Sequence, residues 1–253
     1  MFSTLIGVTL FVFSATQLAT AHPPQLAPRA VTVLNNGTTQ SSGTVVAGLK
    51  WQATGSLTHG PCPGSTSHPI DIGDCYQLSL VSDPKKQLDH GHLDSPRQRI
   101  EFYTSTLADG QSFSYQWRMY LSSQSGTSSS FFHLMQVFSH KDGGPVITLD
   151  AVKDTIAVKD YKRTCGSQTT CPSIALSRFT NHTTVHKVSG VFGPKGRIDY
   201  HVSYVNGTQL LRYNTTGYMG SGGSYIKFGT YRAAFKGMTA VNAAVGVGAF
   251  TGI

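Results

Sequence analysis

Apolar and polar residues alternate along most of this chain, in short runs rich in Val, Ile, Phe and Tyr. Such alternation puts successive side chains on opposite faces of a β-strand, so one face can enter a core while the other meets solvent. No segment keeps apolar residues at the helical period over three turns. The predicted strands span Val31–Leu34, Tyr76–Val81, Arg97–Tyr103, Ser112–Leu121, Phe131–Ser139, Val146–Asp150, Thr155–Lys159, Thr183–Val191, Arg197–Val205, Thr208–Thr215, Ser224–Arg232 and Met238–Phe250.

Clusters of Gly, Pro, Asn and Ser separate these runs. Asn206-Gly207, between two alternating runs, predicts a tight hairpin. The stretches Gln52–Asp74 and Gln124–Ser130 are interpreted as loops, and the Gly- and Ala-rich end, Asn242–Ile253, as a last strand rather than a lipid-anchor signal. No internal repeat or linker divides the chain. We therefore expect an all-β fold, a two-sheet antiparallel sandwich.

The first residues have the pattern of a secretory signal. Leu5 to Leu18 is mostly apolar but short, and Ala19-Thr20-Ala21 is a small-x-small cleavage site. We expect a signal peptide over residues 1–21, a poorly ordered Pro- and Ala-rich tail over 22–30, and one domain over 31–253. The mature protein should be secreted and extracellular.

Cysteines and sequons fit that compartment. In an exported protein the four cysteines suggest two local disulfides, Cys62 with Cys75 and Cys165 with Cys171. A four-cysteine metal site is the alternative, although neither spacing is C-x₂-C. Sequons that could carry glycan, and so indicate a eukaryotic secretory route, begin at Asn36, Asn181, Asn206 and Asn214.

The charged residues exclude some classes of function and favour others. The formal net charge is +8 with a pI near 9.4, but no Lys/Arg run or motif indicates nucleic-acid binding. A basic secreted protein attracts polyanions such as polyuronates. Glu101 is the one glutamate among twelve acidic residues, so a Glu/Glu glycosidase pair is impossible. A pair of aspartates, such as Asp150 with Asp154, remains open.

The run Ser224–Arg232 predicts a strand with one chemically unusual face. Tyr225, Lys227, Gly229 and Tyr231 share that face. The ordinary interpretation is a half-buried strand with solvent-facing polar residues. Alternatively, a phenol beside an ammonium has a lowered pKa and can act as base or acid, while Gly229 leaves room for a ligand.

The strand Arg97–Tyr103 carries Arg97, Arg99, Glu101 and Tyr103 on one face. It is either a solvent-exposed face with an Arg–Glu pair or part of a groove in which arginine binds a substrate carboxylate.

The strand from Phe131 to Phe138 is apolar on both faces and should lie centrally, with Gln136 as its polar exception. Gln136 is either a hydrogen-bonded core glutamine or an amide that donates to a substrate carboxylate. His133 falls on the opposite face from Gln136 unless a bulge intervenes, which argues against a catalytic role for His133.

The segment His90-Gly91-His92 can supply an imidazole instead, or it is a solvated turn. A metal site from His90, His92 and Asp94 rests on spacing alone.

The run Arg97-Gln98-Arg99-Ile100-Glu101, Gln136 in its apolar strand, and Tyr225-Ile226-Lys227-Phe228-Gly229-Thr230-Tyr231 resemble the three sheet motifs of jelly-roll polysaccharide lyases. The resemblance spans roughly Asp94 to Arg232, and the chain as a whole is most similar to fungal glucuronan lyases related to heparin lyase I. It implies a concanavalin A-like β-jelly-roll. One position departs from the alginate-lyase pattern, because Phe138 stands where those enzymes have histidine.

The resemblance implies β-elimination on a 4-linked polyuronate, with glucuronan as the expected substrate. It implies catalytic roles for Tyr225 as base and acid, Gln136 and Arg99 on the substrate carboxylate, and His90. Substrate binding would involve Arg97, Lys227, Tyr231, Glu101 and His92. We expect no cofactor for the chemistry, with a structural calcium ion an open option, a monomer, and no nucleic-acid or membrane partner.

The alternative function is a non-catalytic carbohydrate-binding module or lectin on the same sandwich, with Trp51, Trp117 and tyrosine residues as stacking platforms.

Overall fold

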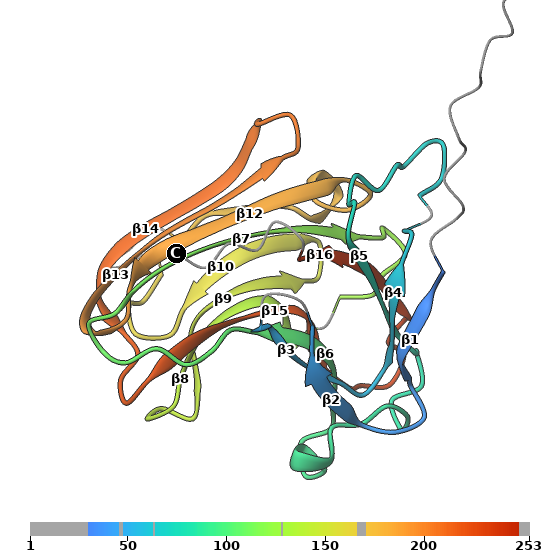
Figure 1. Ribbon diagram of the computed structural model, residues 1–253, viewed down its shortest axis with the longest axis horizontal. Coiled ribbons are helices and arrows are strands. Elements are labelled where there is room, and N and C mark those ends of the chain that lie inside the picture. The colour runs from blue at the N-terminus through green and yellow to red at the C-terminus, as the bar shows by residue number, and fades with distance from the viewer. Residues whose placement is uncertain (1–29, 46–47, 63, 128, 166–170, 248–253) are drawn as a thin grey trace, which may run out of the picture.

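Two eight-stranded antiparallel sheets stack in a computed structural model of the chain, which describes residues 30–45, 48–62, 64–127, 129–165 and 171–247 (Figure 1). The first sheet runs β1 (Thr32–Asn36), β4 (Ser56–Gly60), β5 (Cys75–Leu80), β16 (Val241–Gly246), β7 (Ser112–Leu121), β12 (Thr183–Val191), β13 (Gly193–Tyr204), β14 (Gln209–Met219). The second runs β11 (Ser173–Ala175), β10 (Thr155–Asp160), β9 (Gly144–Val152), β8 (Phe132–Ser139), β15 (Ser224–Ala233), β6 (Arg97–Tyr103), β3 (Lys50–Ala53), β2 (Ser41–Thr44). The predicted all-β jelly-roll sandwich is confirmed.

The core lies between the sheets, where the apolar faces of their strands meet. The ring of Trp117 on β7 stacks on Phe228 of β15 at 4.7 Å between centroids, and Phe228 in turn stacks on Phe102 of β6 at 5.7 Å. All three side chains are buried. Stacked aromatic side chains bury large apolar areas, so this contact ties the two sheets together.

Most predicted strands are confirmed, and so is the hairpin at Asn206-Gly207, where Gly207 has φ +89° between β13 and β14. The loop predicted over Gln52–Asp74 is wrong in its first part, because it overlaps β3 and contains β4. These segments are four and five residues long, and their pairing with β6 and β5 defines them more than their own alternation does.

A β-bulge in the pairing of β8 controls which side chains share a face, because β8 is shifted by one residue against both β15 and β9 between His133 and Met135, whereas β15 pairs with β6 without a shift. Tyr231 pairs with His133, whereas Lys227 pairs with Gln136, so four steps along β15 match three along β8. His133 and Gln136 therefore point to the same side of the second sheet. Sequence alternation placed them on opposite sides, and that prediction is wrong because the bulge intervenes.

Gly229 lies on β15 within this irregular pairing, with φ +134°. A Cβ atom at this position would lie 2.3 Å from the carbonyl oxygen of Ile100 on β6. Glycine is needed here because the neighbouring backbone approaches closely. The interpretation that Gly229 leaves room for a ligand is therefore wrong.

Both predicted disulfides are present, with Cα–Cα distances of 5.8 Å for Cys62–Cys75 and 5.2 Å for Cys165–Cys171. The predicted signal peptide, residues 1–21, and residues 22–29 of the predicted tail lie outside the described residues. None of the helices in the described part of the chain is long and apolar enough to cross a membrane.

Candidate active site

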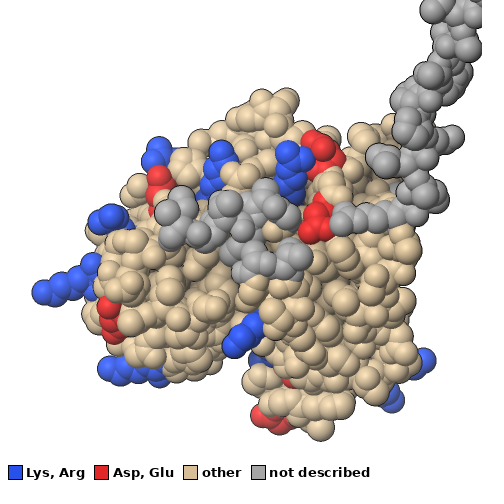
Figure 2. Space-filling view, in the orientation of Figure 1, with Lys and Arg blue, Asp and Glu red and all other residues tan. Residues whose placement is uncertain are grey.

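The three strands singled out in the sequence are neighbours in the second sheet, with β15 between β6 and β8. Figure 1 shows these strands on the inner side of the curved sandwich. In the same orientation, the space-filling view shows a notch in the lower outline with basic side chains at its inner end (Figure 2). Register brings Arg99 and His133 beside Tyr231, and Gln136 and Tyr103 beside Lys227.

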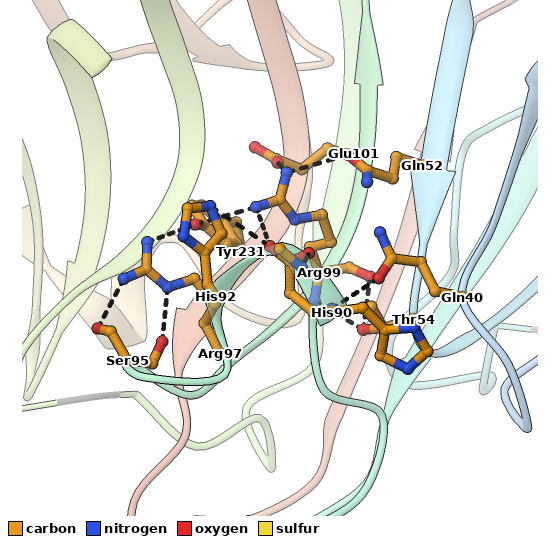
Figure 3. Close-up of polar contacts among 12 residues, drawn as sticks. Gln40, Gln52, Thr54, His90, His92, Ser95, Arg97, Arg99, Glu101 and Tyr231 are labelled. Carbon is orange, nitrogen blue, oxygen red and sulfur yellow. Dashed lines mark hydrogen bonds and ion pairs between the residues drawn. The ribbon is translucent and has the colours of Figure 1, made fainter. Parts of the chain in front are cut away.

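Arg99 is the centre of the polar network on this face (Figure 3). Its guanidinium donates to the carboxylate of Asp89, to the Tyr231 hydroxyl at 3.1 Å and to Gln52 Oε1 at 3.0 Å. Nη1 also lies 3.8 Å from Glu101 Oε2. Burial alone would lower the pKa of Arg99, but Glu101, Tyr231 and Asp89 together raise it. Arg99 is thus a buried cation already matched by two carboxylates.

Glu101 makes the contacts with Gln136 and Arg99 that were expected of a substrate carboxylate. Its Oε1 accepts a 2.5 Å hydrogen bond from Gln136 Nε2, and its Oε2 lies 3.9 Å from Lys227 Nζ. Burial, the largest cause, lowers the pKa of Lys227, against the effect of Glu101. Gln136 and Lys227 therefore both contact this internal carboxylate, and the roles of Gln136 and Arg99 on a substrate carboxylate stay predictions.

The hydroxyl group of Tyr231 is contacted by two arginine side chains. Its hydroxyl accepts hydrogen bonds from Arg97 Nη1 at 2.9 Å and Arg99 Nη2 at 3.1 Å, and Arg99 Cζ lies 4.4 Å from its ring centroid. Burial raises the pKa of Tyr231, while the two arginines act against that rise. The phenol is therefore protonated at neutral pH, and its oxygen is surrounded by donors that would stabilise a phenolate.

Tyr225 lies on the same face but in apolar surroundings. Its ring packs near Phe138 at 5.2 Å, His140 at 5.1 Å and Tyr103 at 6.1 Å. Lys227 Nζ lies 5.7 Å from its centroid. Burial, followed by Glu101 and Tyr103, raises the pKa of Tyr225 to about 12. The expected lowering of this pKa by Lys227 is wrong, because the ammonium is directed to Glu101.

Arg97 is the partly exposed cation beside this network. It donates to the Ser95 carbonyl at 2.8 Å, to Ser95 Oγ at 2.6 Å and to the Tyr231 hydroxyl. Among the described residues it forms no ion pair with a carboxylate, in contrast to Arg99. Its charge is therefore the one available to an anionic ligand.

The two histidines of the 3₁₀ turn η2 (His90–His92) diverge, as Figure 3 shows. His92 Nε2 lies 3.8 Å from Asp89 Oδ2, next to the Arg99 network. His90 is exposed, and it lines a separate cavity of about 640 Å³ together with Gln40 and Lys85. The structure therefore does not bring His90 to the cluster in which it was expected to act.

His133 is the residue that the sequence prediction set aside. Its Nδ1 lies 2.6 Å from Oδ1 of buried Asp150, whose Oδ2 is 2.9 Å from Lys159 Nζ on β10. Burial raises the pKa of Asp150, but His133 and Lys159 more than offset this and the pKa is lowered. The His133 ring lies 5.8 Å from that of Tyr231. His133 reaches this face through the shifted pairing of β8, which the alternation of a single strand cannot predict.

The structure does not support two of the alternatives, a catalytic pair of Asp150 with Asp154 and sugar binding on the two tryptophans. Asp150 is buried and engaged by His133, whereas Asp154 is exposed in the turn after β9, so they do not form a pair on one strand face. Trp51 is 5 % exposed and Trp117 is fully buried, so neither can serve as a platform for a sugar.

Metal and glycan sites were also expected or left open. No group of three or more His, Cys, Asp or Glu side chains that could hold a metal ion occurs within the described ranges, so His90, His92 and Asp94 do not form one. Three sequon asparagines, Asn36, Asn206 and Asn214, are exposed. Asn181 is partly buried and its amide donates to Ser123 Oγ at 2.9 Å.

No protein-family model and no curated protein sequence matches this chain. Several solved polysaccharide lyases resemble it in three dimensions. The alginate lyase AlgAT5 of polysaccharide lyase family 7 is 14 % identical, with 70 % of this chain and 77 % of that chain covered and a TM-score of 0.45. An alginate lyase from Corynebacterium sp. is 13 % identical, with coverages of 70 % and 76 % and a TM-score of 0.44.

The endo-β-1,4-glucuronan lyase of the fungus Trichoderma reesei is 10 % identical, with 75 % of this chain and 87 % of that chain covered and a TM-score of 0.46. Likeness at this level leaves the chemistry of this chain to be decided by its own side chains.

Proposed function

We propose that this protein is a polysaccharide lyase that cleaves a 4-linked polyuronate, glucuronan in the first place, by β-elimination. The observation that carries the proposal is the environment of Tyr231. A protonated phenol receives hydrogen bonds from two guanidiniums on the inner face of a β-sandwich, and one of those guanidiniums has no carboxylate partner among the described residues.

The substrate carboxylate would bind to Arg97. Removing a proton from the carbon next to a carboxylate builds negative charge on its oxygens, and a planar guanidinium can hold both oxygens. Arg99 is the less suitable partner, because Asp89 and Glu101 already compensate its charge. Gln136 and Lys227 then hold Glu101, and through it they position Arg99.

The leaving oxygen would receive its proton from Tyr231. In the elimination, the C5–H electron pair becomes the C4=C5 double bond, the C4–O4 bond breaks, and O4 takes the phenolic proton. The phenolate that remains is stabilised by Arg97 and Arg99, which already donate to its oxygen. The expected roles of the two tyrosines are thereby exchanged, with Tyr225 contacting a sugar ring.

Glucuronan suits this arrangement because H5 and O4 lie on the same side of a β-linked glucuronate ring. The base and the acid must then approach from one side, as two groups on one sheet face can. The net charge of +8 favours any polyanionic substrate by raising its local concentration. The signal-like first 21 residues support a secreted protein, and we propose a monomer that needs no cofactor.

The test is the ultraviolet absorbance of 4,5-unsaturated ends during incubation with glucuronan, alginate, heparin and pectate. Product is expected with glucuronan. Tyr231→Phe should lower kcat by about 10²- to 10⁴-fold. Tyr225→Phe should mainly raise KM, and Tyr120→Phe on the first sheet serves as the matched control. If no polyuronate yields unsaturated product, the proposal is wrong; binding without product would indicate a carbohydrate-binding module.

A further inference from the structure

The elimination needs a base for the C5 proton, and neither tyrosine is suited to that task in the free protein. Burial raises the pKa of both Tyr225 and Tyr231 above that of an ordinary phenol. Each therefore carries its proton at neutral pH and can act first as an acid. A different side chain on the same face should accept the proton.

His133 has the geometry of an oriented base. Its Nδ1 lies 2.6 Å from Asp150 Oδ1, and Asp150 is 1 % exposed. A buried carboxylate in that position fixes the tautomer with the proton on Nδ1, which leaves the lone pair on Nε2. No hydrogen bond to Nε2 is found among the described residues. The ring centroid of His133 lies 4.8 Å from that of Phe131 and 5.8 Å from that of Tyr231, so the three rings form one cluster.

We infer that His133 is the general base of the reaction and that Asp150 is its positioning residue. The inference rests on the lyase function proposed above and adds to it the group that starts the elimination. The irregular pairing of β8 between His133 and Met135 is what makes it possible, because in a regular strand the imidazole would face away from Gln136 and Tyr231.

The proton balance closes with these two groups. His133 Nε2 takes the C5 proton, the C4=C5 bond forms as the C4–O4 bond breaks, and Tyr231 gives its proton to O4. The products are an unsaturated sugar end, an imidazolium and a phenolate. The imidazolium then returns its proton to the neighbouring phenolate, which restores both groups without any further reactant.

Charged and titratable groups from several strands surround the His133 ring. Asp150 faces it from β9, and Tyr231 faces it from β15. Lys159 on β10 lies behind Asp150, and Arg97 of β6 lies 5.6 Å from the centroid of the neighbouring Phe131 ring. Asp150 is the carboxylate in contact with the ring, so it stabilises the imidazolium during turnover, while Lys159 neutralises Asp150 in the resting state.

The experiment uses the full-length mature protein and the polyuronate on which the wild type produces unsaturated ends. His133→Gln should lower kcat about 10²- to 10⁴-fold with little change in binding of a short oligouronate. His133→Gly should regain part of the lost rate when free imidazole is added, which a merely structural role would not allow. Asp150→Asn should also lower kcat, and His68→Gln, in the exposed loop between β4 and β5, should leave it unchanged.

Thermal melts confirm that each variant is folded. A folded His133→Gln with wild-type kcat, or no imidazole rescue of a folded His133→Gly, would overturn the inference and leave the lyase function standing. A wild type that forms no unsaturated product overturns both.

Discussion

Arg97 and Arg99 lie on one strand face, two residues apart, yet they differ in the charges around them. Arg99 is 7 % exposed and pairs with Asp89 and Glu101, whereas Arg97 is partly exposed and meets only neutral partners, Ser95 and Tyr231. One guanidinium therefore has mainly a structural task, and the other can bind an anion.

The two arginines should respond differently to the same substitution. Arg99→Gln removes the guanidinium shared by buried Asp89 and Glu101 and leaves Glu101 only the more distant ammonium of Lys227, so we expect a loss of about 3–5 kcal/mol in the free energy of unfolding. Arg97→Gln should change stability by less than about 1 kcal/mol. It should lower kcat/KM by about 10- to 100-fold, the equivalent of one charge-assisted hydrogen bond of about 1.5–3 kcal/mol.

Denaturant unfolding and steady-state kinetics measure these two effects separately, and Arg97→Lys, which keeps the charge but not the planar fork, is the matched control. Equal destabilisation by both glutamine variants would contradict the distinction between them.

At this scale the sequence predicted which residues share the face but not their partners. The alternation rule placed Arg99, Glu101, Lys227 and Tyr231 together, as the structure confirms. It could not show that Glu101 accepts a hydrogen bond from Gln136. These residues are 35 positions apart, and their contact depends on how β15 lies between their strands.

Among the elements, β15 lies at the centre of the site between β6 and β8, and its close pairing with β6 depends on one glycine, Gly229. Gly229→Ala would place a methyl group against the Ile100 carbonyl and force an alanine to φ +134°. Backbone strain and overpacking together should cost about 2–5 kcal/mol.

Displacing β15 from β6 should also move Tyr231 relative to Arg99 and His133, its register partners, so activity should fall further than the lost stability explains. Denaturant unfolding together with kcat at a temperature where the variant is folded separates the two losses. Gly143→Ala, at a turn glycine with positive φ but open space around its Cβ position, is the control for strain alone. A Gly229→Ala variant as stable as Gly143→Ala would show that the close approach of β6 is unimportant.

The strands themselves were largely predictable, and the exceptions have a physical reason. Long runs such as Ser112–Leu121 carry their own alternation, and β7 has the predicted bounds. The short strands β2, β3 and β11 contain three or four residues, too few for a periodicity, and they gain their hydrogen bonds from neighbouring strands. The bulge was missed for a related reason, since register is a property of strand pairs.

Across the whole molecule, one buried histidine couples the packing of the two sheets to pH. His186 on β12 is fully buried beneath Trp117, with centroids 5.0 Å apart. Its ring nitrogens lie 2.7 Å from the Tyr200 hydroxyl and 3.0 Å from Thr184 Oγ1. Burial lowers the pKa of His186 to about 3. The imidazole is therefore neutral in the folded protein and holds two hydroxyl groups in the core.

This burial predicts how stability changes on acidification. The unfolded chain binds a proton at His186 below about pH 6.5, the ordinary imidazole value, whereas the folded protein binds it only below about 3. Between these values the unfolded state holds more protons, so the free energy of unfolding falls as the pH is lowered, by up to about 1.4 kcal/mol per pH unit from this residue. The lowered pKa of Asp150 adds its effect only at the acidic end, below the ordinary carboxyl range.

Denaturant unfolding between about pH 6.5 and 4.5 therefore isolates the histidine. We expect the wild type to lose up to about 3 kcal/mol over this range. His186→Gln should be less stable at neutral pH but should show a flatter dependence, because an amide keeps hydrogen-bonding capacity without titrating. An unchanged slope in this variant would show that other groups cause the acid sensitivity. A flattened slope would identify the contact between Trp117 and His186 as the acid-sensitive part of the core, on the opposite sheet from His133.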